Sequence, residues 1–115
     1  MPRPRKRRRV CALPDVTRFG PLGRPKNDCD IIVMSIDEYE CIRLIDHQNM
    51  TQAECAEAMN VARTTVQGMY DAARKKLAKV LTEASILVIE GGDYEISASH
   101  CDNRHHRRQH QHCEE

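Results

Sequence analysis

Two helix-capping sequences in the middle of the chain constrain its fold more than any other feature. Ser35 stands three residues before Glu38, and Thr51 stands three residues before Glu54. In such a capping box the hydroxyl accepts a hydrogen bond from the backbone N–H of the glutamate, and the carboxylate accepts one from the backbone N–H of the hydroxyl residue. We therefore expect a helix after each box. The first should end near Asp46, because its apolar residues share one side only that far.

A third helix is expected soon after the second, across a turn at Asn60. After Gly, Asn is the residue that best tolerates the left-handed conformation in which many helices end. From Ala62 to about Thr82 the apolar residues recur on one stripe, and the opposite face is polar. The second helix, which starts at Gln52, is too short to be stable alone and must pack on its neighbours, with Ala56 at the contact. This spacing predicts a helix-turn-helix.

Short β-branched runs lie on both sides of the helices. Residues 31–34 predict a brief strand, while residues 86–96, with a Gly-Gly-Asp turn in the middle, are typical of a β-hairpin. A lone hairpin is marginally stable in water, so we expect it to pack on the helices or to pair with residues 31–34. The predicted fold class is mainly α, a three-helix core with the helix-turn-helix and a small hairpin. We divide the chain into a flexible basic arm and irregular segment at 1–30, a helix-turn-helix domain with the hairpin at 31–97, and a polar His/Cys-rich tail at 98–115.

The composition excludes several classes of protein. With 115 residues, 3% aromatic residues and no Trp, the core must be built from small aliphatic and sulfur-containing side chains, which excludes a large enzyme core. No apolar segment follows the basic N-terminus as in a signal peptide, and no run of about eighteen apolar residues could span a membrane, so we expect a soluble cytoplasmic protein. In the reducing cytoplasm we expect the six cysteines to be thiols or metal ligands rather than disulfides. Cys41 and Cys55 should be buried. The compact part, about 65 to 70 residues, is near the limit for a lone core and is compatible with a homodimer.

Charge is strongly segregated along the chain. The formal net charge of +1 conceals residues 1–26, with nine Lys and Arg against one Asp (+8), and residues 27–50, with one Arg against six acids (−5). Basic N-terminal arms commonly contact nucleic acid, although a solvated tail that raises solubility has the same composition. No Ser, Cys or His accompanies the acids at a spacing suited to catalysis, so no enzyme is expected. Four acids around the first helix predict instead an acidic surface, which RNA polymerase or another protein could contact: Asp37, Glu38, Glu40 and Asp46.

The arm and the helix-turn-helix together predict binding to double-stranded DNA. The amino-terminal turn of the recognition helix enters the major groove, where its dipole favours phosphate and its first side chains reach base edges. Arg63 can contact guanine or phosphate, and Gln67 suits adenine. An ordinary helix pair in a small bundle would show the same spacing, and Gly68 in mid-helix costs about 1 kcal/mol relative to Ala. The candidate DNA-binding residues are Arg3, Arg5, Lys6, Arg7, Arg8 and Arg9 in the arm and Thr51, Gln52, Arg63, Thr64, Thr65, Gln67, Gly68 and Lys75 in the helices.

The tail contains seven potential metal ligands within fourteen residues. Imidazole and thiolate suit a transition metal such as zinc or nickel. The spacing matches no standard zinc finger, and interleaved arginines repel a cation, so a disordered tail that chelates metal opportunistically is the alternative. The second hypothesis for the whole chain is thus a small metal-binding or protein-interaction module with a purely structural helix-turn-helix. The candidate ligands are His100, Cys101, His105, His106, His110, His112 and Cys113.

Six blocks of the sequence point to a known family. They are Met1–Pro4 with the Arg-rich run, Phe19–Gly23, Asp37–Asp46, Thr51–Gln52, Ala62–Thr65 and Ile89–Tyr94. Together they resemble uncharacterised protein family 0251, also called domain of unknown function 134, small prokaryotic proteins predicted to bind DNA. The family's helix-turn-helix is similar to region 4 of sigma-70 factors, which implies a role in transcription. Ala62 stands where such motifs usually carry a Ser cap, and Gly68 where a basic residue is common, so the arm is expected to supply much of the affinity.

Overall fold

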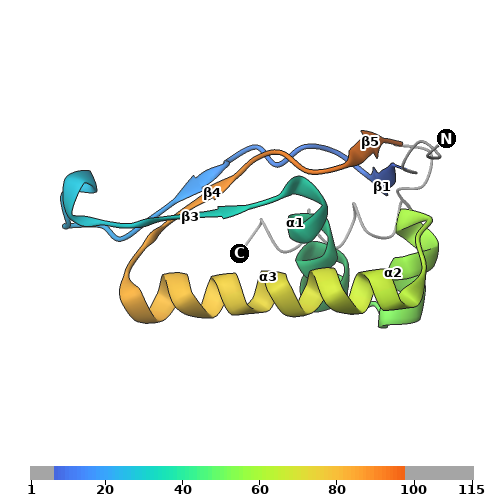
Figure 1. Ribbon diagram of the computed structural model, residues 1–115. Coiled ribbons are helices and arrows are strands. Elements are labelled where there is room, and N and C mark those ends of the chain that lie inside the picture. Colours follow the sequence, from blue (N-terminus) through green and yellow to red (C-terminus); the bar gives the residue numbers. More distant parts are fainter. Residues whose placement is uncertain (1–6, 98–115) are drawn as a thin grey trace, which may run out of the picture.

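The computed structural model describes residues 7–97, in which strands cover one side of a long helix (Figure 1). The helical elements are α1 (Ile36–Ile42), a π-helical turn that continues it (Arg43–His47), α2 (Gln52–Met59) and α3 (Arg63–Glu83). The strands are β1 (Arg8–Val10), β2 (Arg18–Phe19), β3 (Ile31–Met34), β4 (Ile86–Ile89) and β5 (Tyr94–Ile96), and a 3-10 turn (Lys26–Asp28) precedes β3. The expected mainly helical chain with a small β part is confirmed. No helix among these residues has both the length and the apolar character that a membrane span requires.

Both capping boxes form as the sequence predicts. At the start of α1, the Glu38 N–H donates to Ser35 Oγ over 3.2 Å, and the Ser35 N–H donates to Glu38 Oε1 over 2.9 Å. At the start of α2, the corresponding distances between Thr51 and Glu54 are 3.1 and 2.8 Å. The π-helical turn after α1 ends at His47, so the first helical region also ends close to the expected position.

The turn between α2 and α3 is a tight one with fixed geometry. Asn60 has the expected left-handed conformation, with φ 59° and ψ 47°. Its N–H donates to the Glu57 carbonyl over 3.2 Å, and the Val61 N–H donates to the Ala56 carbonyl over 3.0 Å. These bonds satisfy carbonyls at the end of α2. Residues 60–62 therefore set the direction of α3 relative to α2.

β4 is the central strand of a three-stranded sheet in the order β2, β4, β3. β3 pairs with β4 in parallel, with Ile31 opposite Ile86 and Met34 opposite Ile89, and β2 pairs with β4 in antiparallel orientation. Pairing with residues 31–34, one of the two arrangements expected for the β-branched run after the helices, is confirmed. Parallel pairing needs a long connection, which here consists of all three helices.

The prediction of a β-hairpin for residues 86–96 is wrong, because β4 and β5 do not pair with each other. β5 pairs in parallel with β1, in a second sheet of two strands. Gly91 and Gly92 both have positive φ, at 77° and 105°, and lead the chain past the amino end of α1. There the Ile36 N–H donates to the Gly91 carbonyl over 2.9 Å. The glycines therefore redirect the chain from one sheet to the other instead of reversing it.

Part of the expected flexible arm belongs to this second sheet. Arg8 lies opposite Tyr94 and Val10 lies opposite Ile96 in the parallel ladder. Val10 is buried against the helical core, which anchors the strand. The basic segment is thus structured from Arg8 onward, while the expected arm residues 1–6 and the whole tail, 98–115, lie outside the described residues.

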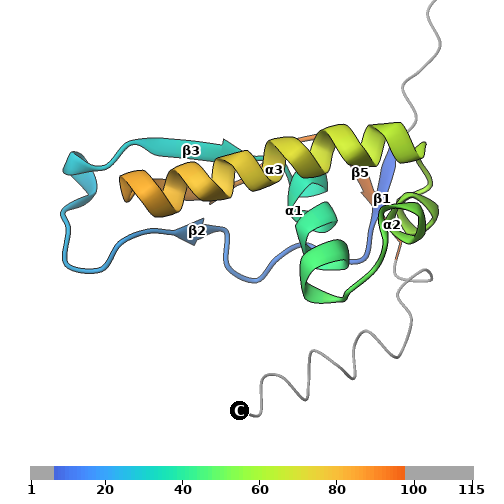
Figure 2. The ribbon, with the colours of Figure 1, turned by 90° about the horizontal axis from the view of Figure 1, so that it is seen from below.

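The core lies where α3, α1, α2 and the strands meet. Figure 2 shows α1 lying across α3, with α2 at the amino end of α3 and seen almost along its axis. The core is made of aliphatic and sulfur-containing side chains, as the composition predicts. Its most deeply buried members include Val10, Met34, Cys41, Leu44, Cys55, Met59 and Val66.

Candidate nucleic-acid interface

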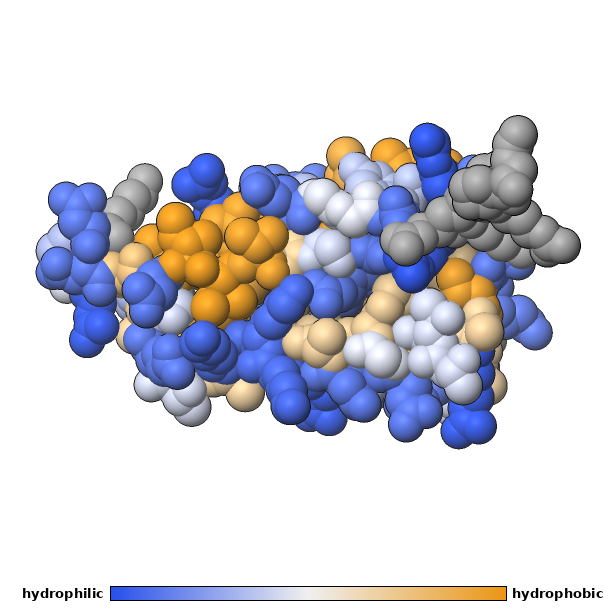
Figure 3. Space-filling view, viewed as in Figure 1, coloured by the Kyte–Doolittle hydropathy of each residue, from blue (hydrophilic) through white to orange (hydrophobic). Residues whose placement is uncertain are grey.

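The side of α3 that faces away from the strands is polar and exposed. Val66 and Ala73 are fully buried on the inner side. In Figure 3 the lower edge of the molecule, over α3, is mostly hydrophilic. We call this surface the α3 outer face and define it by its exposed residues: Arg63, Thr64, Gln67, Gly68, Asp71, Arg74, Lys75, Ala78 and Lys79.

Five of the candidate DNA-binding residues lie together on the α3 outer face. They are Arg63, Thr64, Gln67, Gly68 and Lys75. A sixth, Thr65, is half-buried at its border. A Cβ atom added to Gly68 would meet no atom within 4 Å, so internal packing does not require glycine there. The open space beside Gly68 lets another molecule approach the backbone of α3 closely.

The amino end of α3 is open to an anion. Ala62 precedes it in extended conformation and offers no side-chain acceptor. The N–H groups of Thr65 and Val66 donate to the Ala62 carbonyl, over 3.0 and 3.2 Å, whereas those of Arg63 and Thr64, at the first two helical positions, precede the internal ladder. The helix dipole and these N–H groups favour a negative group at this end. The absence of a Ser cap therefore leaves room for a phosphate next to the exposed Arg63.

Arg74 belongs to the α3 outer face but was missed by the sequence analysis. Tyr70 Oη donates to Asp46 Oδ1 over 2.6 Å, and Arg74 Nε lies 3.8 Å from Asp46 Oδ2. The guanidinium also lies 5.4 Å from the centre of the Tyr70 ring. The hydrogen bond to Asp46 raises the pKa of Tyr70, so the phenol stays a donor. Arg74 stands seven residues after Gln67, two turns along the same face, and helical periodicity could have identified it.

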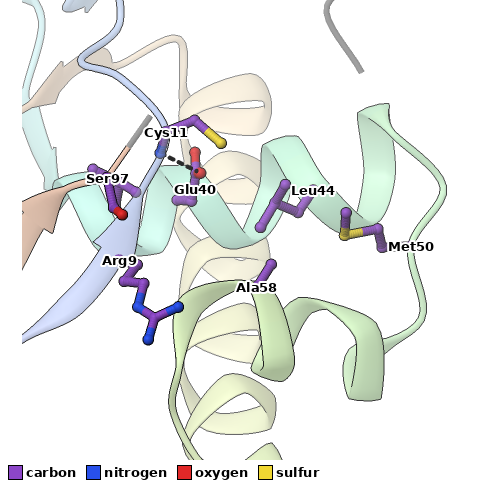
Figure 4. Close-up of a pocket in the computed structure, with 8 residues that line it drawn as sticks. Arg9, Cys11, Glu40, Leu44, Met50, Ala58 and Ser97 are labelled. Atoms are coloured by element: carbon purple, nitrogen blue, oxygen red, sulfur yellow. Dashed lines mark hydrogen bonds between the residues drawn. The ribbon is translucent and has the colours of Figure 1, made fainter. Parts of the chain in front are cut away.

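The arginines of β1 have different environments. Arg8 donates to Asp37 Oδ2 over 2.8 Å and lies 3.9 Å from Asp93 Oδ2, so its charge is engaged inside the molecule. Arg7 is exposed. Arg9 is half-buried and lines a small cavity of about 10 Å³, where its side chain extends toward Ala58 of α2 (Figure 4). The candidates Arg3, Arg5 and Lys6 lie outside the described residues.

The prediction that Asp37 and Glu40 belong to an acidic surface is wrong, because both residues are buried. Their exposed fractions are 4% and 1%. Glu40 accepts from Arg43 Nε and a terminal guanidinium nitrogen over 2.8 and 2.9 Å, and from the Cys11 N–H over 3.0 Å. Glu38 accepts from Lys76 of α3 over 2.6 Å. These acids therefore tie α1 to the basic N-terminal segment and to α3 instead of forming a surface for a partner.

The remaining candidates are divided between α2 and the tail. Thr51 is exposed, but its hydroxyl caps α2, and Gln52 beside it is half-buried. The seven expected metal ligands, His100, Cys101, His105, His106, His110, His112 and Cys113, lie outside the described residues. Within 7–97, no group of three or more His, Cys, Asp and Glu residues is arranged to hold a metal ion.

A family model and individual relatives both match this chain, and both point to the same family. The family model described as "Protein of unknown function DUF134" matches residues 1–97. A UPF0251 protein of Desulfitobacterium hafniense strain Y51 is 57% identical over 96 residues, which cover 84% of this chain and 77% of that protein. A UPF0251 protein of Halothermothrix orenii strain H 168 is 42% identical over an aligned length of 117 residues, with 93% and 87% covered. No solved structure matches the chain.

Proposed function

The chain belongs to the uncharacterised DUF134 family, also named UPF0251, and we propose that it is a DNA-binding transcriptional regulator that uses α2 and α3 as a helix-turn-helix. The observation that carries the proposal is the α3 outer face with its open amino end. It combines an uncapped helix terminus, exposed Arg63 and Gln67, and the glycine at position 68. These are the features that let a helix enter a major groove.

Different parts of α3 would contact different parts of the duplex. Arg63 and Gln67 are the side chains suited to guanine and adenine edges, and the N–H groups near Thr64 suit a phosphate. With a rise of about 1.5 Å per residue, Lys75 lies about 16 Å along the helix from Thr64. This length exceeds the width of a major groove, about 12 Å. Arg74 and Lys75 would therefore reach the phosphates at the groove edge, which positions the protein without reading sequence.

The role of α2 in this proposal is to hold the recognition helix in place. Such motifs cross the DNA backbone with their first helix while the second lies in the groove. Here the left-handed Asn60 and the buried Ala56 and Val66 fix the contact between α2 and α3. The likeness to region 4 of sigma-70 factors, implied by the family resemblance, supports a transcriptional role. Arg7 and the basic residues before it would add phosphate contacts.

The proposal predicts that two substitutions on α3 weaken DNA binding while the fold is retained. Because Arg63 and Gln67 are exposed, the double variant Arg63→Ala/Gln67→Ala should fold normally. We expect its affinity for a fluorescein-labelled duplex, measured by anisotropy, to fall about 30-fold or more, since each base or phosphate contact contributes about 1–3 kcal/mol.

The matched control for this experiment is Arg24→Ala. Arg24 is also exposed, but it belongs to the connection between β2 and β3. Figure 1 shows this connection at the end of the molecule opposite α2. Its removal should change affinity less than about twofold, because one distant charge is screened by salt. Equal losses in both variants would indicate non-specific attraction and would contradict the role of α3.

A further inference from the structure

Three sulfur atoms meet in the core where α1 packs against α2. The Sγ atoms of Cys41 in α1 and Cys55 in α2 each lie 3.8 Å from the Sδ atom of Met59. All three side chains are fully buried, with 0% of their surface exposed. The neighbouring Cys55 thiol and burial in the core both raise the pKa of Cys41. The core thus brings two thiols, one from each helix, into contact with the Met59 thioether of α2.

The separation of these sulfurs matches that of ligands around one metal ion. Metal–sulfur bonds in proteins are about 2.3 Å long, and three sulfurs at that distance in a trigonal arrangement lie about 4 Å apart. The two measured separations of 3.8 Å correspond to bonds of about 2.2 Å by the same relation. Since coordination bonds are shorter than van der Waals contacts, an ion can sit between the sulfurs without a pre-existing cavity.

We propose that Cys41, Cys55 and Met59 bind one soft metal ion of the Cu(I) class between α1 and α2. Thiolate and thioether donors select soft ions, and harder ions prefer carboxylate, carbonyl or water ligands. Within residues 7–97 no group of three or more His, Cys, Asp and Glu residues is arranged to hold a metal ion, and the third donor of this site is the Met59 thioether, whose sulfur lies 3.8 Å from each thiol sulfur. That donor is what favours Cu(I) over Zn²⁺ at this site.

The charge balance of the site also favours a monovalent ion. Each thiol that becomes a thiolate releases its proton to solvent. When Cu(I) replaces the proton of one thiol, the buried group stays neutral, and the second sulfur can coordinate as a thiol. A neutral centre avoids the cost of a buried net charge. Two acids whose charges act on Cys41, Asp37 and Glu40, are paired with Arg8 and Arg43.

Bound metal would join the end of α2 to α1. Met59 is the last residue of α2, immediately before the Asn60 turn, and Cys41 lies near the end of α1. An ion held only by the folded protein stabilises it in proportion to the logarithm of its free concentration. The site therefore predicts a thermal stabilisation by Cu(I), and this prediction does not depend on DNA binding.

The experiment uses the full, reduced chain and Cu(I) buffered with a colorimetric Cu(I) chelator. Because the tail also contains His and Cys, total metal uptake cannot locate the site, and two local readouts replace it. One equivalent of Cu(I) should shift the methyl resonance of Met59 in protein labelled at the Met methyl groups, and it should raise the melting temperature. Zn²⁺ at the same concentration should do neither at this site.

Variants keep the test independent of folding. Met59→Leu preserves an apolar side chain of similar volume. The affinity for Cu(I), derived from the rise in melting temperature at each Cu(I) concentration, should fall at least tenfold in this variant. Met69→Leu, at a half-buried methionine of α3 packed against the same core, is the control and should behave like the wild type. Cys41→Ala and Cys55→Ala should each abolish the rise.

Two results would overturn the proposal. An unmoved Met59 methyl resonance at one equivalent of Cu(I) would show that the metal binds elsewhere in the chain. An equal stabilisation of wild type and Met59→Leu would show that Met59 is not a ligand and that the sulfurs are packed only as small apolar groups.

Discussion

Raising the salt concentration from about 50 to about 200 mM is expected to weaken binding of the full chain to double-stranded DNA roughly a thousandfold. The α3 outer face contributes four exposed cations to the proposed interface, Arg63, Arg74, Lys75 and Lys79, and the exposed Arg7 directly precedes β1 on the strand side of α3. With the basic residues before Arg7, contact with about six phosphates corresponds to a slope near −5 of log K against log salt. The slope is measured by fluorescence anisotropy of a labelled duplex across the salt series.

Single substitutions in the same salt series assign the salt dependence to individual residues. Lys75→Ala should reduce the magnitude of the slope by about one, because Lys75 is exposed on α3 and is proposed to contact one phosphate. Arg24→Ala, at the opposite end of the molecule, should leave the slope unchanged. An affinity that does not depend on salt would contradict the proposed interface, since every nucleic-acid surface of this kind displaces counterions.

Glu40→Ala is expected to lower the free energy of unfolding by about 3–5 kcal/mol. Glu40 is buried, and its carboxylate accepts hydrogen bonds from the Arg43 guanidinium and the Cys11 N–H. Removal of the carboxylate leaves a mostly buried guanidinium without its counter-charge, and the desolvation cost of the arginine is then uncompensated. Urea denaturation followed by circular dichroism measures the loss.

The control for this prediction is Glu57→Ala. Glu57 is exposed on α2, and its removal should change the free energy of unfolding by less than about 0.5 kcal/mol. If Glu40→Ala does not fold, Glu40→Gln, which keeps one oxygen acceptor, should show an intermediate loss. A loss for Glu40→Ala no larger than that for Glu57→Ala would mean that the buried pair does not support the fold.

The helices could be predicted from the sequence because their signals are local. Each capping box involves residues three apart, and the Asn60 turn bonds to carbonyls within the preceding turn. The energies that decide these features come from neighbours in the sequence. For the same reason, the polar stripe of α3 and most of the candidate interface could be identified before the structure.

The strand pairing could not be predicted in full because it depends on partners far away in the chain. The Gly-Gly turn looked like a hairpin, but Gly92 lies against α1, where an added Cβ would be 2.5 Å from Asp37 Oδ1. The chain after this contact is directed to β1, where Tyr94 pairs with Arg8, 86 residues earlier. A turn motif predicts only the local backbone conformation. The partner of the strand that follows is determined by the contacts of Gly91 and Gly92 with the amino end of α1.

The charges show the same limit. The separation of basic and acidic segments is visible in the sequence, but several of these charges pair with each other inside the folded protein instead of facing solvent. Asp37 pairs with Arg8 and Glu38 pairs with Lys76, across separations that no sequence pattern predicts. Arg74, on the α3 outer face that we propose as the interface, contacts Tyr70 and Asp46 in the same way.

The central claim is that the α3 outer face contacts DNA, and amide NMR tests it most directly. A mixed-sequence duplex is titrated at low salt into ¹⁵N-labelled protein until anisotropy shows saturation. We expect the amide signals of residues 63–68 to shift most, while those of residues 18–24 at the opposite end stay nearly unchanged. Saturated binding with shifts at 18–24 and none at 63–68 would contradict the claim.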